Sequence, residues 1–124
     1  MLTPEQIIKL GQETLAIEVK ALVAAEAKIS QNFVDACLLI KQCGGKVVVT
    51  GLGKSGHIAR KIAATFASTG TSAFFLHPSE ALHGDMGMLQ ARDILLALAY
   101  SGETAEVIEV CKFAKRQQIP IIAL

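Results

Sequence analysis

The chain has 124 residues, which is room for one domain of ordinary size but not for two. Apolar residues make up 52% of it and charged residues only 19%, so the composition excludes a disordered chain and supplies a substantial core. Twelve basic residues against eleven acidic ones leave a formal net charge of +1, and from this balance we expect neither a nucleic acid nor an anionic membrane as a partner.

Two amphipathic helices are predicted at the start of the chain, in residues 1–45. Thr3-Pro4-Glu5-Gln6 has the residues of a capping box, with proline at the first helical position. Apolar residues then recur on one wide face, at Ile8, Leu15, Leu22 and Ile29. A face of this kind needs a partner surface. A second helix is expected to begin at Ser30 and to end at Gly44-Gly45.

From Lys46 onward the pattern alternates between strands and helices. Strands are expected at 46–50, 72–76, 93–99 and 120–124, and helices at 55–68, around 80–82 and at 104–117. Short connections between such elements indicate an α/β fold with a parallel sheet wound by right-handed crossovers. The last apolar strand runs into the final residue, so we expect a sheet that is incomplete at its C-terminal end and a chain that is part of a larger domain.

The cysteines Cys37, Cys43 and Cys111 are odd in number and form no CxxC pair. Apolar neighbours favour small buried thiols in a reducing compartment. No early segment joins positive charge to an apolar run, and no apolar run reaches the roughly 18 residues of a membrane span. We therefore expect a cytoplasmic protein without a membrane partner.

Loops beyond the carboxyl ends of the strands are where ligands bind in open α/β sheets. The first is Gly51-Leu52-Gly53-Lys54-Ser55-Gly56, whose glycines permit a tight turn and whose lysine and helix amides attract anions. It is not a Walker A loop, because Val48 stands where that motif needs a glycine. Its GxGxxG spacing leaves a dinucleotide site open, but Leu76 and His77 stand where the ribose-binding acidic residue is expected.

The other two loops carry hydroxyls, histidines and a nearby glutamate. Ser101 and Thr104 could each donate to a phosphate oxygen, or simply cap the helix that follows. His77 and His83 suit acid–base work but are fewer than the three protein ligands of a catalytic zinc ion. Glu106, one turn into the helix, could serve either as a partner of the helix dipole or in catalysis.

The residues from Val47 to Ile108 resemble the sugar isomerase (SIS) domain, and specifically the arabinose-5-phosphate isomerase family. The resemblance rests on GLGKSGHIARKIAATFASTGT, FFLHPSEALHGDMGML and SGETAEVIEV, which are long and nearly free of gaps. It implies a three-layer αβα sandwich with a parallel sheet. It also implies two parts of the chain, a helical segment at 1–45 and a partial SIS domain at 46–124. The implied reaction interconverts D-ribulose 5-phosphate and D-arabinose 5-phosphate for Kdo and lipopolysaccharide synthesis, moving a proton between adjacent carbons through an enediol.

The same resemblance implies the site residues. Catalytic roles fall on Lys54, which stabilises charge, on His83 and on Glu106, which matches one of the family's catalytic glutamates. Contacts with the phosphosugar substrate are implied for Gly53, Ser55, Gly56, Gly70, Thr71, His83, Ser101, Gly102 and Thr104. His77 matches a position associated with zinc, although the reaction itself is expected to require no cofactor.

Further expectations concern assembly and activity. Family members form homotetramers, which would bury the apolar leading helices, and they usually continue into a paired CBS domain that is absent here. A second glutamate and another histidine lie further along the family's domain, so we expect the 124-residue chain alone to be inactive. The main alternative is a non-catalytic sugar-phosphate sensor, because SIS domains also serve in transcriptional regulators. Capsule and sugar-alcohol pathways stay open beside the lipopolysaccharide role.

Overall fold

A computed structural model describes all 124 residues of the chain. In chain order the elements are α1 (Pro4–Glu26), α2 (Gln31–Lys41), β1 (Val47–Gly51), α3 (Lys54–Ser68), β2 (Ala73–Leu76), α4 (Pro78–Leu82), the 3-10 turn η1 (Asp85–Met88), β3 (Ile94–Leu98), α5 (Ala105–Arg116) and β4 (Ile121–Ala123). Contacts within the chain define two compact units, Met1–Asp35 and Ala36–Leu124. The larger unit includes the second half of α2. The boundary predicted at 45/46 separates a helical segment from a partial domain and stays a prediction.

The first unit consists of α1 and the start of α2. As predicted, Thr3 and Gln6 form a capping box: the Thr3 hydroxyl accepts a hydrogen bond from the Gln6 amide at 3.3 Å, and the Gln6 side chain accepts one from the Thr3 amide at 2.8 Å. The helix ends at Glu26, before the predicted Ile29. None of its residues is buried, so its apolar side chains are exposed in the single chain.

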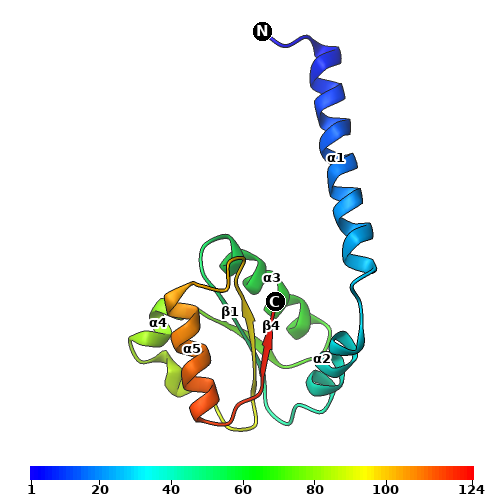
Figure 1. The fold of residues 1–124 in the computed structure, drawn as a ribbon. Coiled ribbons are helices and arrows are strands. Elements are labelled where there is room, and N and C mark those ends of the chain that lie inside the picture. The colour runs from blue at the N-terminus through cyan, green and yellow to red at the C-terminus, as the bar shows by residue number, and fades with distance from the viewer. The chain divides into compact units, whose positions relative to one another are not determined.

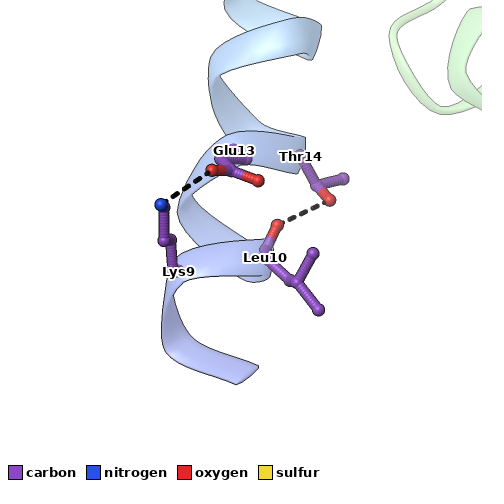
Figure 2. A network of polar contacts seen from close by, with 4 residues as sticks. All are labelled: Lys9, Leu10, Glu13 and Thr14. Carbon is purple, nitrogen blue, oxygen red and sulfur yellow. Dashed lines mark hydrogen bonds and ion pairs between the residues drawn. The ribbon is translucent and has the colours of Figure 1, made fainter. Parts of the chain in front are cut away.

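The polar contacts of α1 are local (Figure 2). Lys9 Nζ lies 3.8 Å from a carboxylate oxygen of Glu13 one turn further on, and the Thr14 hydroxyl donates to the Leu10 carbonyl oxygen at 2.9 Å. Both contacts are exposed, and an exposed ion pair of this kind contributes about 0.3–0.5 kcal/mol. They support the helix but leave its apolar face without a partner.

A four-stranded parallel sheet organises the second unit, in the order β2-β1-β3-β4. The central strands β1 and β3 are buried along their whole length, as their unbroken apolar sequences predicted. Their register pairs Val47 with Ile94 and Gly51 with Leu98, so the two strands end side by side. The outer strands β2 and β4 are shorter and only partly buried.

Helices cover both faces of the sheet, which confirms the predicted three-layer α/β architecture (Figure 1). On one face, Ala59 and Ala63 of α3 pack against Val47 and Val49 of β1. On the other face, α4 and α5 pack against side chains that alternate with these along the strands, and this cluster comprises Val48, Leu76, Ala81, Leu89, Leu95, Val110, Ala114 and Ile119.

Two buried polar side chains tie the strands together. The Asp93 carboxylate, 1% exposed, accepts hydrogen bonds from the amides of Lys46 and Gln90, each at 2.9 Å, and so joins the amino ends of β1 and β3. The Thr50 hydroxyl donates to the Leu76 carbonyl oxygen at 2.8 Å and joins β1 to β2. Every buried side-chain polar atom in the structure has a hydrogen-bond partner.

One element was not predicted, and one expectation about side-chain burial needs correction. The 3-10 turn at Asp85–Met88 was not predicted, because a four-residue turn has no apolar period to reveal it. The prediction of buried thiols was wrong: Cys37 is exposed, while Cys43 and Cys111 are partly exposed. No helix in the structure combines the length and apolar character needed to cross a bilayer.

Candidate functional site

The loops that follow β1 and β3 lie next to each other at one edge of the sheet. Because Gly51 pairs with Leu98, residues 51–56 and residues 99–104 leave the sheet from adjacent positions. Each of these loops leads directly into a helix, α3 after the first and α5 after the second. Two helix N-termini therefore follow neighbouring strands, as ligand sites in open α/β sheets require.

Glycines let α3 approach β1 closely. A Cβ atom at Gly56 would lie 2.7 Å from the Gly51 carbonyl oxygen, and one at Gly51 would lie 3.0 Å from the Ser55 carbonyl. Gly53 between them has φ +59°, a left-handed conformation that glycine adopts without strain. The GxG turn and its following glycine thus place the first turn of α3 directly over the end of β1.

The first turn of α3 offers donors to an anion. No side chain caps the helix at Gly53, and no hydrogen bond is present from the backbone amides of Lys54 or Ser55. Unpaired amides and the positive end of the helix dipole both favour a negatively charged ligand. The exposed Lys54 side chain adds a full positive charge at the same position.

A hollow of about 690 Å³ opens beside this turn, next to the carboxyl ends of β3 and β4. Lys54, Ser55 and Ile58 line it from α3, and Ala99 and Tyr100 line it from the second loop. Sequence reasoning had selected Lys54 and Ser55 but missed Tyr100. The position of Tyr100 could have indicated this, since it is the chain's one tyrosine and directly follows a predicted buried strand.

The second loop is shaped by its own hydrogen bonds. The Ser101 hydroxyl accepts from the Glu103 amide at 3.2 Å, and Gly102 has φ +71°. Thr104 occupies the N-cap of α5, but its hydroxyl makes no capping bond and is free to meet a ligand. Ser101 is thus partly engaged in the turn, as the capping interpretation allowed, whereas Thr104 is not.

The candidate catalytic side chains lie at the ends of three different helices. Lys54 begins α3, the exposed His83 ends α4, and the half-buried Glu106 lies in the first turn of α5. No hydrogen bond or ion pair joins any two of them. Their positions are therefore set by three separate helices and not by hydrogen bonds or ion pairs with one another.

Gly70 and Thr71 lie away from the other predicted contacts. They connect α3 to the beginning of β2, and the Val47 amide at the start of β1 bonds the neighbouring Ser72 carbonyl oxygen at 2.9 Å. This is the amino edge of the parallel sheet, opposite the edge that carries residues 51–56 and 99–104. Within one chain the structure separates this pair from the hollow.

His77 has a structural role that the sequence did not predict. Its Nδ1 accepts the Ser79 amide at 3.2 Å and caps α4. The neutral ring then carries its proton on Nε2, and nowhere do three or more His, Cys, Asp or Glu side chains gather as a metal site would need. The residues of this chain do not fit a complete zinc site, so no chemical step is assigned to zinc, and the association of His77 with zinc stays a prediction.

Both the sequence and the fold of this chain match known proteins. The family model described as "SIS domain" matches residues 39–124. The chain is 52% identical over 114 residues to the arabinose 5-phosphate isomerase KdsD of Shigella flexneri and 45% identical over 120 residues to the arabinose 5-phosphate isomerase GutQ of Escherichia coli K12. These matches take in 92% and 97% of this chain but only 35% and 37% of the relatives, so the chain spans about a third of their length.

A solved structure resembles the fold over nearly the whole chain. The E. coli CFT073 protein c3406, in complex with arabinose 5-phosphate, superposes with a TM-score of 0.93 and 39% sequence identity, covering 98% of this chain and 65% of that one. The phosphoheptose isomerase GmhA of Neisseria gonorrhoeae, at 23% identity and a TM-score of 0.79, shares the fold.

Proposed function

This chain belongs to the SIS domain family, and we propose that it forms the phosphosugar-binding part of an isomerase that interconverts D-arabinose 5-phosphate and D-ribulose 5-phosphate. One observation carries the proposal: unpaired helix amides, Lys54 and Ser55 border a hollow at the carboxyl edge of the sheet. The names of relatives at 45–52% identity support the choice of sugar. The phosphosugar bound to the E. coli protein supports the ligand class.

The phosphate group is proposed to lie at the start of α3. There the amides of Lys54 and Ser55 and the Ser55 hydroxyl donate hydrogen bonds, and the Lys54 ammonium balances the charge. Thr104 adds a hydroxyl from the second loop, where it has no competing capping bond. Hydrogen bonds to a charged group contribute about 1.5–3 kcal/mol each, so three or four of them offset much of the entropy lost when the sugar phosphate is ordered.

The proposed reaction moves one proton between two carbons. Glu106 removes the proton from C2 of the open-chain aldose, and the electrons of that bond form the double bond of an enediol as the C1 carbonyl oxygen is protonated. The proton is then returned to C1 while the hydroxyl at C2 loses its proton and becomes the ketone carbonyl. Lys54 stabilises the negative charge that develops on oxygen. His83 is proposed to contact the sugar. No cofactor takes part in these steps.

Completion of the site by other copies of the chain is part of the proposal. Gly70 and Thr71 lie at the opposite sheet edge, so they can touch the substrate only from a second copy. The exposed apolar face of α1, with Leu15 at 67% and Leu22 at 70%, supplies a surface for such association. We expect light scattering to show a homotetramer. Leu15→Lys should dissociate it, because it places a charge on the apolar face, whereas Glu18→Gln on the same helix should leave it intact.

Proton abstraction is the step that tests the catalytic assignment. The chain is incubated with arabinose 5-phosphate in D₂O, and incorporation of deuterium at C2 is followed by NMR, which detects exchange even when net turnover is slow. Glu106→Gln should slow this exchange by about a hundredfold or more, because general base catalysis typically contributes that much. Glu103→Gln is the matched control, since it removes an exposed carboxylate three residues away and should leave the exchange unchanged.

The outcomes separate the two candidate functions. Exchange that depends on Glu106 supports the isomerase. Tight binding of the phosphosugar with no exchange, in this chain and also in a version extended to the length of the relatives, would instead identify a sugar-phosphate sensor. Lack of net turnover by the 124-residue chain alone belongs to the proposal, because a second glutamate and another histidine of the family's domain lie outside it.

The cellular role is proposed on the same resemblance. The arabinose 5-phosphate would supply Kdo and lipopolysaccharide synthesis. The thiols of Cys37, Cys43 and Cys111 are all free, which fits a reducing compartment, and we propose the cytoplasm. Restored growth of a strain lacking its own arabinose 5-phosphate isomerase, by a gene carrying this segment in place of the relative's, would support that role.

A further inference from the structure

The helix α1 carries apolar side chains on more of its surface than the face of Leu15 and Leu22. A second stripe runs along a different side of the helix, because its members recur every three or four residues from a different starting point. We call it the 7–24 stripe, and its members, none of them buried, are Ile7, Leu10, Thr14, Ile17, Ala21 and Ala24. A helix that is apolar on two sides is suited to packing against two partners.

The sizes of the side chains in the 7–24 stripe are self-complementary. Large side chains stand mainly in its first half and small ones in its second half. A second copy of α1 laid antiparallel, so that Thr14 faces Ile17 of that copy, therefore puts a large side chain against a small one along the whole stripe. The facing pairs are Ile7–Ala24, Leu10–Ala21 and Thr14–Ile17. A parallel copy would put each residue against itself, and the facing alanines would leave voids.

Charges beside the stripe favour the same orientation. Glu13 and Lys20 each directly precede a member of the stripe, and the antiparallel arrangement places Glu13 of one copy beside Lys20 of the other. Within one chain Lys20 has no ion pair, and Glu13 has only the exposed contact with Lys9 at 3.8 Å (Figure 2). A parallel copy would instead bring Glu13 beside Glu18, and these like charges repel.

We propose that two copies of this chain pair α1 against α1, antiparallel, through the 7–24 stripe. The contact is separate from the face of Leu15 and Leu22, so each α1 joins two other copies. A closed tetramer with three two-fold axes needs two different interfaces of this self-complementary kind, and one helix supplies both. The pairing extends the association proposed above and does not depend on the isomerase activity.

Sedimentation equilibrium tests the pairing in the 124-residue chain carrying Leu15→Lys, which leaves the 7–24 stripe as the apolar side of α1. This variant should be a dimer. Adding Lys20→Glu should weaken the dimer about fivefold or more, because Glu13 then meets a like charge twice across the two-fold axis. Adding Glu13→Lys as well should restore the affinity, because the opposite charges face each other again.

A matched control reverses a charge away from the stripe. Glu26 lies on the opposite side of α1 from the 7–24 stripe, so Glu26→Lys should change the affinity of the same dimer less than about twofold. This control separates the facing pair from a general effect of the charge on α1.

Disulfide formation tests the orientation. Cys37, Cys43 and Cys111 are first replaced by serine, and two versions of the Leu15→Lys chain are made, one with Leu10→Cys and one with Ala21→Cys. One version carries a size tag, and the two are mixed and oxidised. The antiparallel pairing predicts that the mixed dimer predominates over the two dimers of identical chains, whereas a parallel pairing predicts the reverse.

The proposal is overturned if the Leu15→Lys chain is a monomer, which would leave the stripe to its own chain, or if disulfides form mainly between identical chains. It is also overturned if the charge-swapped variant associates no better than Lys20→Glu, or if Glu26→Lys weakens the dimer as much. None of these outcomes involves deuterium exchange at C2 of the sugar, so failure of the pairing and failure of the isomerase are distinguishable.

Discussion

Replacing Gly56 with alanine should separate α3 from β1. The added Cβ would lie 2.7 Å from the Gly51 carbonyl oxygen, whereas ordinary contacts begin at 3.4 Å, so the backbones must move apart by the difference, 0.7 Å. Gly51 cannot yield easily, because it is buried and a Cβ in its own place would lie 3.1 Å from the Leu98 carbonyl oxygen. The clash is therefore between two backbones and not with a flexible side chain.

The cost of this change can be estimated. Overpacking of a well-packed site costs about 1–3 kcal/mol, and alanine returns about 0.5–1 kcal/mol through its better helix propensity. The net loss is therefore about 0–2.5 kcal/mol, with a central value of about 1 kcal/mol, and each kcal/mol should lower the melting temperature by about 4–8 °C in a unit of the size of Ala36–Leu124. Movement of the first turn of α3 should also weaken phosphosugar binding, because the amides of Lys54 and Ser55 move with it.

The assay is thermal unfolding followed by circular dichroism, with Gly87→Ala as the matched control. Gly87 has open space around its Cβ position and no left-handed backbone, so alanine there should leave the melting temperature within about 2 °C of the parent. If Gly56→Ala unfolds at the same temperature as the parent chain, the close approach of α3 to β1 is not what this glycine serves.

Three further predictions concern buried polar groups and a thiol. Asp93→Asn should lower the free energy of unfolding by about 1–3 kcal/mol, because one oxygen that accepts an amide becomes a donor facing it; an unchanged urea midpoint would contradict this. Thr50→Val removes the bond to the Leu76 carbonyl and should cost about 1 kcal/mol in the same assay, and a gain in stability would argue against the bond. Burial raises the pKa of the Cys111 thiol, so at pH 8 less of it is thiolate, and iodoacetamide should modify it more slowly than the exposed Cys37; equal rates in single-cysteine variants would refute this.

Most of the fold could be predicted because its signals are local. The apolar runs of β1 and β3 are buried on both faces, and such runs are typical of central parallel strands. The capping box at Thr3 and Gln6 depends only on residues three apart. The end of α1 at Glu26 could not be predicted from the apolar repeat, because Ile29 continues the period without forming part of the helix.

The residues of the candidate site could be predicted where a reactive side chain directly follows a strand. They could not be predicted where the role of a residue depends on a tertiary hydrogen bond. Lys54 and Ser55 follow a strand directly, so their place at the sheet edge follows from the parallel topology. His77 as a helix cap depends on one hydrogen bond, and Asp93 as the link between β1 and β3 depends on residues 47 positions apart. Neither has a pattern in the sequence that distinguishes it from an ordinary polar residue.

The placement of Gly70 and Thr71 shows a different limit. A resemblance assigns residues to one substrate, but it does not say which copy of a chain supplies them. The parallel sheet places this pair at its amino edge and the loops of residues 51–56 and 99–104 at its carboxyl edge. Sequence motifs alone contain no information of this kind.

An NMR titration with arabinose 5-phosphate tests the central claim most directly, namely that residues 51–56 and 99–104 together hold a phosphosugar. Backbone amide signals of both loops should shift saturably and with one common affinity, with the largest changes at Lys54 and Ser55, whose amides are unpaired. Arabinose without its phosphate should leave them in place. Equal shifts with the unphosphorylated sugar, or shifts confined to other parts of the chain, would contradict the account.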